Sequence, residues 1–217
     1  MNDISVVKGG VTLAAIAAIC TALVALTYLS TQDRIAENEK LWLERSLQPA
    51  LSGLFFDSGV TESKLTIPPP HELPGSDAAI VYRVYAEDEP VAALFVVSAR
   101  DGYAGSIRLL IGIDVHGSVS GVHVLQHRET PGLGDKVESS KSDWVKQFDG
   151  RSLLDPKEAA WAIKRDGGAF DQLTGASVTP RAIVRAVKET LLYFAANQDV
   201  VFAAPEPDQA VQEEEDK

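Results

Sequence analysis

The sequence predicts an α+β fold, in which one apolar N-terminal helix is followed by a single domain built from an antiparallel sheet plus helices. Three observations predict it. Four β-rich runs follow one another between residues 79 and 128, separated only by short polar turns. A segment near the C-terminal end of the chain carries apolar residues at helical spacing. Near the N-terminus, residues 9–32 are mostly apolar and contain no charged side chain.

The N-terminal segment 9–32 is predicted to be one transmembrane helix. About 20 apolar residues at about 1.5 Å per residue are enough to span the hydrocarbon core of a bilayer. A cleaved signal peptide is the alternative, but its apolar region is usually about 7–15 residues long, and no A-x-A cleavage site follows this one. Basic residues flank both ends of the segment, so the positive-inside rule does not set its orientation.

The connection between this helix and the domain is predicted over residues 33–76. Residues 33–52 predict a juxtamembrane helix that ends near Pro49. Residues 57–76, "DSGVTESKLTIPPPHELPGS", are rich in Pro, Ser and Gly, which favours an irregular connection.

The domain itself is predicted over residues 77–198 and begins with the sheet. We expect an antiparallel meander with strands over residues 79–86, 90–99, 106–114 and 119–128. Two short helices are expected to follow, over residues 142–148 and 156–165. The second would place Pro156 at its first position, directly after Asp155.

The last helix of the domain is expected to open with Thr179 as its cap residue and Pro180 at its first position. Its apolar face is formed by Ile183, Val187, Leu191 and Phe194. Residues 199–217 are rich in acidic side chains, so we expect a disordered, solvated tail.

Composition limits the chemistry that the chain can perform. With 217 residues, of which 45% are hydrophobic and 24% charged, one principal globular domain is expected. The net charge of −11 argues against a nucleic-acid partner. Cys20 is the only cysteine, which excludes an intramolecular disulfide and a cysteine-ligated iron–sulfur cluster within this chain. Any redox chemistry therefore depends on an organic cofactor.

A turn directly before the last helix is a candidate anion site. Gly175, Ala176 and Ser177 lie where free backbone N–H groups and the positive end of the helix favour a phosphate. The alternative is a plain helix cap, in which these hydroxyls bond only to their own backbone. A serine hydrolase is disfavoured, because "GASVT" is not a G-x-S-x-G elbow and no histidine follows it.

This turn resembles a known modification signature. "DQLTGAS", residues 171–177, is similar to the D-x-x-[ST]-G-A-[ST] motif on which flavin transferases attach FMN through its phosphate. The wider sequence resembles the G subunit of the Rnf complex, called Rsx in enteric bacteria, as far as about residue 194. The resemblance is carried by "DGYAGSIRLLIGID" (101–114), "HRETPGLGDKVE" (127–138), "SDWVKQF" (142–148) and "WAIKRDGGAFDQLTGASVTPRAIVRAV" (161–187).

The resemblance implies a periplasmic FMN-binding domain on one helix of the bacterial inner membrane, with residues 1–8 in the cytoplasm. It implies covalent FMN on Ser177, added by a flavin transferase. The family more often has threonine at this position, but a serine hydroxyl can form the same phosphoester; Thr174 is the less favoured acceptor. The expected partners are inner-membrane lipid and the other Rnf subunits, in a translocase that couples electron transfer between ferredoxin and NAD to ion transport. The chain itself would be an electron carrier without catalytic residues of its own.

Further residues are expected to contact the flavin. In the attachment signature they are Asp171, Thr174, Gly175 and Ala176, and in the loop "ETPGLGD" they are Glu129, Thr130, Pro131, Gly132, Leu133 and Gly134. The loop is not a dinucleotide-binding fingerprint, and a plain connecting turn is its alternative interpretation. Lys164 is expected to place positive charge near a reduced flavin, or else to lie at a solvated helix end.

Other candidates and other functions carry less weight. His123 and His127 would share one face of a strand, but no third ligand accompanies them, so we expect no metal site. His127 is expected to support the loop at Glu129. Trp144 and Trp161 are expected in the core. The alternative functions are the C subunit of a sodium-translocating NADH:quinone reductase, which shares the attachment signature, and an anchored, non-redox partner-binding module.

Overall fold

The computed structural model describes Gly10, residues 13–14, 16–18 and 20–21 near the N-terminus, and residues 63–87 and 89–203. The chain divides into two compact units, Met1–Leu43 and Glu44–Lys217. The described residues of the first unit are helical and exposed. Most of the predicted transmembrane helix and all of the predicted juxtamembrane helix lie outside the described residues, as do residues 204–217. Among the residues that are described, no helix is long and apolar enough to span a bilayer.

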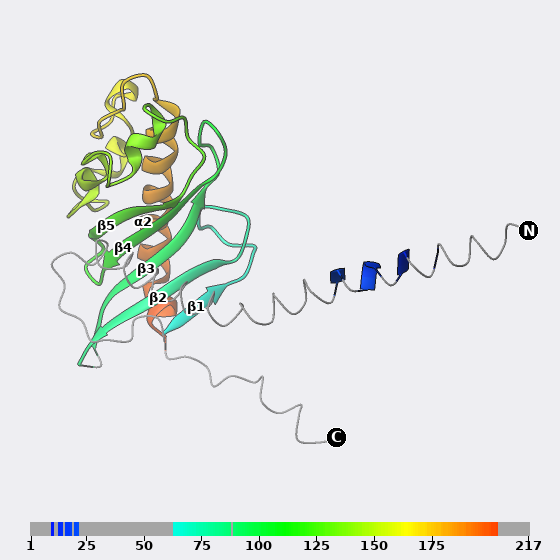
Figure 1. The fold of residues 1–217 in the computed structure, drawn as a ribbon. Coiled ribbons are helices and arrows are strands. Elements are labelled where there is room, and N and C mark those ends of the chain that lie inside the picture. The colour runs from blue at the N-terminus through cyan, green and yellow to red at the C-terminus, as the bar shows by residue number, and fades with distance from the viewer. Residues whose placement is uncertain are drawn as a thin grey trace, which may run out of the picture. The chain divides into compact units, whose positions relative to one another are not determined.

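The second unit contains one five-stranded antiparallel sheet, in which the strands lie side by side in chain order (Figure 1). The strands are β1 (Lys64–Ile67), β2 (Ala79–Ala86), β3 (Glu89–Ala99), β4 (Ile107–Asp114) and β5 (Val119–Gln126). The predicted meander is therefore confirmed, with β2 to β4 within one residue of the expected bounds. The fourth predicted strand ends at Gln126 instead of residue 128.

The edge strand β1 was not predicted, because residues 57–76 were expected to be irregular. Its four residues pair antiparallel with β2, from Lys64 opposite Tyr82 to Ile67 opposite Ala79. Leu65 and Ile67 alternate with the exposed Lys64 and Thr66 and are half-buried. The strand is short and leads into a proline-rich stretch, so its alternation is too brief to be recognised in the sequence.

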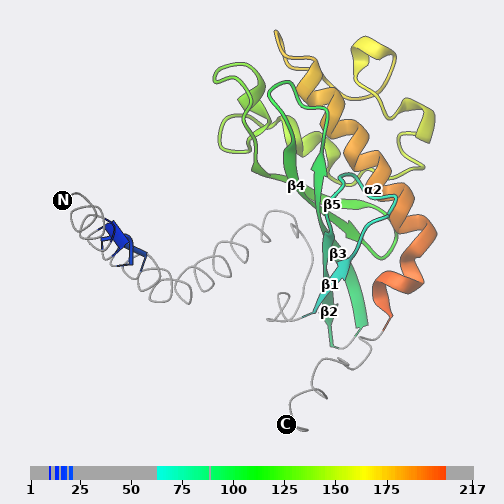
Figure 2. The ribbon, with the colours of Figure 1, turned by 90° about the vertical axis from the view of Figure 1, so that its right-hand side faces the viewer.

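The long helix α2 (Val178–Phe202) covers one face of the sheet (Figure 2), and it packs mainly against β3. The predicted apolar face is confirmed, because Ile183, Val187, Leu191 and Phe194 are each at most 1% exposed. The Phe194 ring lies edge-on to Phe95 of β3 at 6.1 Å.

The start of α2 differs from the expectation. The helix begins at Val178 with Ser177 as its cap residue, so Thr179 is not the cap. Thr179 and Pro180 lie in the first turn. Pro180 has no backbone N–H, but this costs no hydrogen bond, because the first N–H groups of a helix have no acceptor within it. At its other end, α2 reaches Phe202, with non-helical backbone at Asn197 (φ −129°, ψ 21°). There Arg83 of β2 donates from Nη1 to the Ala203 carbonyl at 2.5 Å, which places positive charge at the helix C-terminus.

Short 3-10 segments occupy the chain between β5 and α2. They are η2 (Gly134–Val137), η3 (Trp144–Phe148), η4 (Glu158–Ala160) and η5 (Lys164–Asp166). The helix expected over 142–148 is thus a shorter 3-10 turn.

The helix expected over residues 156–165 is wrong. Trp161 and Ile163, two residues apart, are both buried, and the backbone at Ile163 is extended, with φ of −71° and ψ of 152°, so the chain between η4 and η5 is not helical. Ile163 pairs with Phe170 as an isolated bridge. Trp144 and Trp161 are core residues, as predicted, and both lie close to Phe148, at 5.4 Å and 6.4 Å between ring centres.

Candidate functional site

The carboxylate of Glu129 joins three segments of the second unit. Glu129 is 5% exposed. Its Oε1 accepts a hydrogen bond from the Ala104 N–H, 3.0 Å away, in the connection between β3 and β4. Its Oε2 accepts one from the hydroxyl of Thr179, which is fully buried in the first turn of α2. Because both oxygens are engaged by different segments, Glu129 fixes the "ETPGLGD" loop against both.

Glu129 and Thr179 can pack closely against the loop because Gly134 has no side chain. A Cβ atom at Gly134 would lie 2.8 Å from Glu129 Oε2 and 3.0 Å from Thr179 Oγ1. Both separations are shorter than ordinary van der Waals contact, so any larger residue would push the Glu129 and Thr179 side chains apart.

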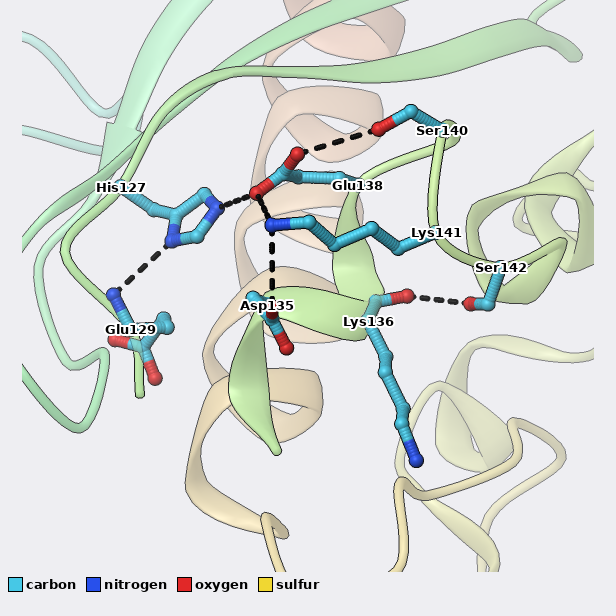
Figure 3. Close-up of polar contacts among 8 residues, drawn as sticks. All are labelled: His127, Glu129, Asp135, Lys136, Glu138, Ser140, Lys141 and Ser142. Atoms are coloured by element: carbon cyan, nitrogen blue, oxygen red, sulfur yellow. Dashed lines mark hydrogen bonds and ion pairs between the residues drawn. The ribbon is translucent and has the colours of Figure 1, made fainter. Parts of the chain in front are cut away.

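His127 holds the loop from the other side and begins a chain of polar contacts (Figure 3). Its Nδ1 accepts the Glu129 N–H at 3.0 Å. The proton of the neutral ring therefore resides on Nε2, which lies 2.7 Å from Glu138 Oε1. The expected supporting role of His127 is confirmed. Since both ring nitrogens are engaged, His127 is not available to share a metal ion with His123.

Lys141 completes this network by pairing with two carboxylates. Its Nζ lies 2.6 Å from Glu138 Oε1 and 3.1 Å from Asp135 Oδ2. The hydrogen bond from Lys141, aided by His127, holds the pKa of Glu138 below its usual value. The pKa of Asp135 is also lowered, first by a backbone hydrogen bond from Gly132 and then by Lys141.

The remaining residues of the loop face outward. Thr130, Pro131, Gly132 and Leu133 are exposed, whereas Glu129 and Gly134 are buried. The Thr130 carbonyl accepts hydrogen bonds from the N–H groups of Leu133 at 3.2 Å and Gly134 at 3.1 Å, which fixes the turn. The loop thus presents four residues to solvent while its two ends are packed into the domain.

The segment 171–177 lies against this loop. Gly175 has a positive φ of 82°, which side-chain-bearing residues rarely adopt, and a Cβ there would lie 3.1 Å from Leu133 Cδ2. Thr174 and Gly175 are exposed, and Ala176 and Ser177 are half-buried. The sequence places these two stretches more than 30 residues apart, and the fold brings them into contact.

The carboxylate of Asp171 does not face Ser177 but pairs with Lys164 Nζ at 2.6 Å. The Asp171 backbone is fixed on both sides, because its N–H donates to Gln147 Oε1 and its carbonyl accepts from Trp144 Nε1, each at 2.7 Å. Asp171 therefore anchors the start of the segment 171–177 to the preceding 3-10 turns.

The cation beside the Ser177 hydroxyl is Arg165 and not Lys164, which the sequence analysis singled out. Arg165 Nη1 donates to Ser177 Oγ at 3.2 Å, while Lys164 is engaged by Asp171. The two residues are adjacent on η5, and only the geometry of this turn decides which of them faces Ser177. The pair of adjacent cations "KR" was the one sequence signal that could have pointed to Arg165 as a partner of Ser177.

Comparison with known proteins gives the family. Residues 102–192 match the FMN-binding domain, and residues 1–49 match the RnfG N-terminal region. A protein of Shewanella amazonensis is 43% identical over 93% of this chain and 94% of its own length. One of Pseudomonas aeruginosa is 43% identical over 93% and 94%, and one of Pseudoalteromonas atlantica 39% over 92% and 93%. Each of the three is named as the G subunit of an ion-translocating oxidoreductase complex. The chain belongs to this G-subunit family.

The resemblance inferred from the motifs is thereby confirmed, and neither alternative function is favoured. The FMN-binding domain of this G-subunit family member spans the Glu129 loop, the segment 171–177 and the first part of α2. The elements that the Glu129 carboxylate joins are therefore all part of the matched domain.

Proposed function

We propose that this chain is the membrane-anchored flavoprotein subunit of an Rnf-type complex and that it carries FMN covalently on Ser177. In this role it relays electrons within a machine that couples electron transfer between ferredoxin and NAD to ion translocation. The membership of the G-subunit family and the matched FMN-binding domain support the electron-transfer role.

The observation that carries the choice of Ser177 is the contact of its hydroxyl with Arg165. The three candidate hydroxyls have different environments. That of Thr179 is fully buried and bonded to Glu129, so it is not accessible to a modifying enzyme. Thr174 is exposed, and no cation of the described domain donates to its hydroxyl. Ser177 combines partial exposure with a guanidinium donor at 3.2 Å, and a guanidinium group binds phosphate oxygens favourably.

The residues present fit a flavin phosphate. Gly175 lets a ligand approach the backbone closely, and Ser177 lies at the N-terminal end of α2, which favours negative charge. When bound, FMN supplies reversible uptake and release of electrons. Attachment through the phosphate would leave the flavin ring without a covalent bond to the protein, and the exposed residues Thr130–Leu133 of the loop that Glu129 keeps in place would help to hold it.

The membrane topology and the partners of this subunit are inferred from its family. We infer that residues 1–8 are cytoplasmic, that residues 9–32 cross the inner membrane once, and that residues 33–76 lead to a periplasmic FMN-binding domain at 77–198. The partners are the other Rnf subunits, inner-membrane lipid and, during maturation, a flavin transferase. The RnfG N-terminal match over residues 1–49 supports this arrangement.

Substitution of Ser177 tests the proposal, with Thr174 as a matched control. The full-length protein is produced together with a flavin transferase and run on a denaturing gel, on which only covalently bound flavin is retained. We expect flavin fluorescence in the wild-type protein and in Thr174→Ala, and none in Ser177→Ala. A fluorescent Ser177→Ala band, or a wild-type band without fluorescence, would contradict the proposal.

A further inference from the structure

Arg165 is an uncommitted cation in a turn whose other charged residues are paired. On one side of it, Lys164 pairs with Asp171 at 2.6 Å. On the other, Asp166 forms two hydrogen bonds with Arg181, at 2.6 Å and 3.0 Å. Arg165 takes part in no ion pair within 4.0 Å among the residues that the structure describes, although its charge adds to that of Arg181 in lowering the pKa of Asp166. Its side-chain hydrogen bond there is with Ser177 Oγ.

The turn that presents Arg165 is fixed by its backbone. The Lys164 N–H donates to the Phe170 carbonyl at 2.6 Å, and the Gly168 N–H donates to the Ile163 carbonyl at 3.0 Å. A Cβ at Gly168 would overlap the Ala162 carbonyl oxygen, only 1.9 Å away, so the turn closes tightly on itself. These contacts fix the shape of the turn, and the Asp166–Arg181 pair joins it to the first turn of α2.

A neutral hydroxyl is a weak partner for a guanidinium group. Arginine gains most from an anionic oxygen, and its planar set of donors matches the oxygens of a phosphate. In this acidic protein, with a net charge of −11, carboxylates are plentiful, yet the structure directs Arg165 toward a serine oxygen instead. This arrangement suits a ligand that brings negative charge to that oxygen.

We propose that Arg165 is the phosphate-binding residue of the flavin site and determines which hydroxyl of the segment is modified. The inference rests on the proposed attachment at Ser177. Arg165 contacts the flavin-side phosphate of a flavin dinucleotide donor. The Ser177 Oγ–phosphorus bond forms as the bond from that phosphorus to the departing nucleotide phosphate breaks, and the serine proton is lost to solvent. The resulting diester keeps one negative charge, which Arg165 then neutralises.

Thr174 illustrates the selectivity. It lies three residues before Ser177 on the same segment and is more exposed, so access alone would favour it. Within residues 89–203, however, no cation donates to its hydroxyl. Arg165 is thus the feature that distinguishes the two acceptors.

The test measures the rate of flavin attachment to purified, unmodified full-length protein, incubated with flavin transferase, flavin adenine dinucleotide and Mg²⁺. Loss of a charge-assisted contact to phosphate is expected to slow attachment about 10- to 100-fold in Arg165→Gln. Lys146→Gln, the matched control, removes an exposed lysine whose Nζ pairs with Asp143 at 2.7 Å, and it should stay within about 2-fold of the wild-type rate. Arg165→Lys should fall between the two, because it keeps the charge but loses the planar fork.

Two further readouts separate phosphate binding from a merely structural role. Added guanidinium ion at low concentration should restore part of the rate to Arg165→Ala, whereas sodium at equal ionic strength should not. Peptide mass analysis should show the share of modification at Thr174 rising in Arg165→Gln. An unchanged rate in a folded Arg165→Gln protein, or no response of Arg165→Ala to guanidinium, would overturn the inference. A wild-type protein that takes up no flavin would instead refute the attachment at Ser177.

Discussion

Truncation of Glu129 is expected to loosen the site and destabilise the domain. In Glu129→Ala, the Thr179 hydroxyl and the Ala104 N–H both lose their acceptor. An unsatisfied buried donor costs about 1–3 kcal/mol. Thr179 is fully buried and takes the upper part of this range, whereas Ala104 is exposed and can regain water. The sum is about 2–4 kcal/mol, or a Tm lower by roughly 5–15 °C for a protein of this size.

Urea unfolding followed by tryptophan fluorescence measures this loss, because Trp144 and Trp161 are buried in the same domain. Glu129→Gln is the matched control. It keeps an acceptor for the Ala104 N–H and a polar group for Thr179. Its free energy of unfolding should therefore fall by about half as much as that of Glu129→Ala, or less. A Glu129→Ala protein within about 0.5 kcal/mol of wild type would refute the reasoning that this carboxylate joins the three segments.

Two other perturbations test the same region. The lowered pKa values of Glu138 and Asp135 contribute stability that is present above about pH 4 and lost as the pH falls through the lowered values. Lys141→Gln should therefore reduce stability more at pH 7 than at pH 3, as thermal unfolding at both pH values can show. Gly134→Ala should cost about 1–3 kcal/mol in urea unfolding, because its methyl group would collide with Glu129. Combined with Glu129→Ala, it should cost less than the sum of the two, and full additivity would contradict the contact.

The sheet was largely predictable because its signals are local. The runs that form β2, β3 and β4 are rich in β-branched residues and end at turn sequences, so their bounds could be placed within a residue. The edge strand β1 was missed for the opposite reason. Its four residues carry one apolar alternation, and the prolines that follow favour an irregular chain.

The segment between the sheet and α2 was predicted less well, because tertiary packing decides its structure. Residues 156–165 have the composition of a helix, with several alanines and charged residues. Trp161, which lies close to Phe148, and Ile163 are both buried, and the backbone at Ile163 is extended, so tertiary packing outweighs local helix propensity. In α2 the two influences agree, since the apolar residues recur at helical spacing and pack against β3.

The candidate site was predictable as a set of segments but not as a set of contacts. The resemblance singled out both the Glu129 loop and the segment 171–177, and the structure brings Leu133 against Gly175. Sequence spacing could not tell that Glu129 faces the interior while Leu133 faces outward. Nor could it tell that Lys164 is paired with Asp171 and that its neighbour Arg165 reaches Ser177. Such choices depend on the direction of single side chains in tight turns.

The central claim is a phosphoester between FMN and the hydroxyl of Ser177, and peptide mass spectrometry tests it most directly. Cleavage after Arg165 and Arg181 releases residues 166–181, which contain Thr174, Ser177 and Thr179. In protein isolated from its native membrane, we expect this peptide to carry the mass of FMN less water, with fragment ions that place it on Ser177. A peptide that is unmodified throughout the sample, or modified only at one of the two threonines, would contradict the account.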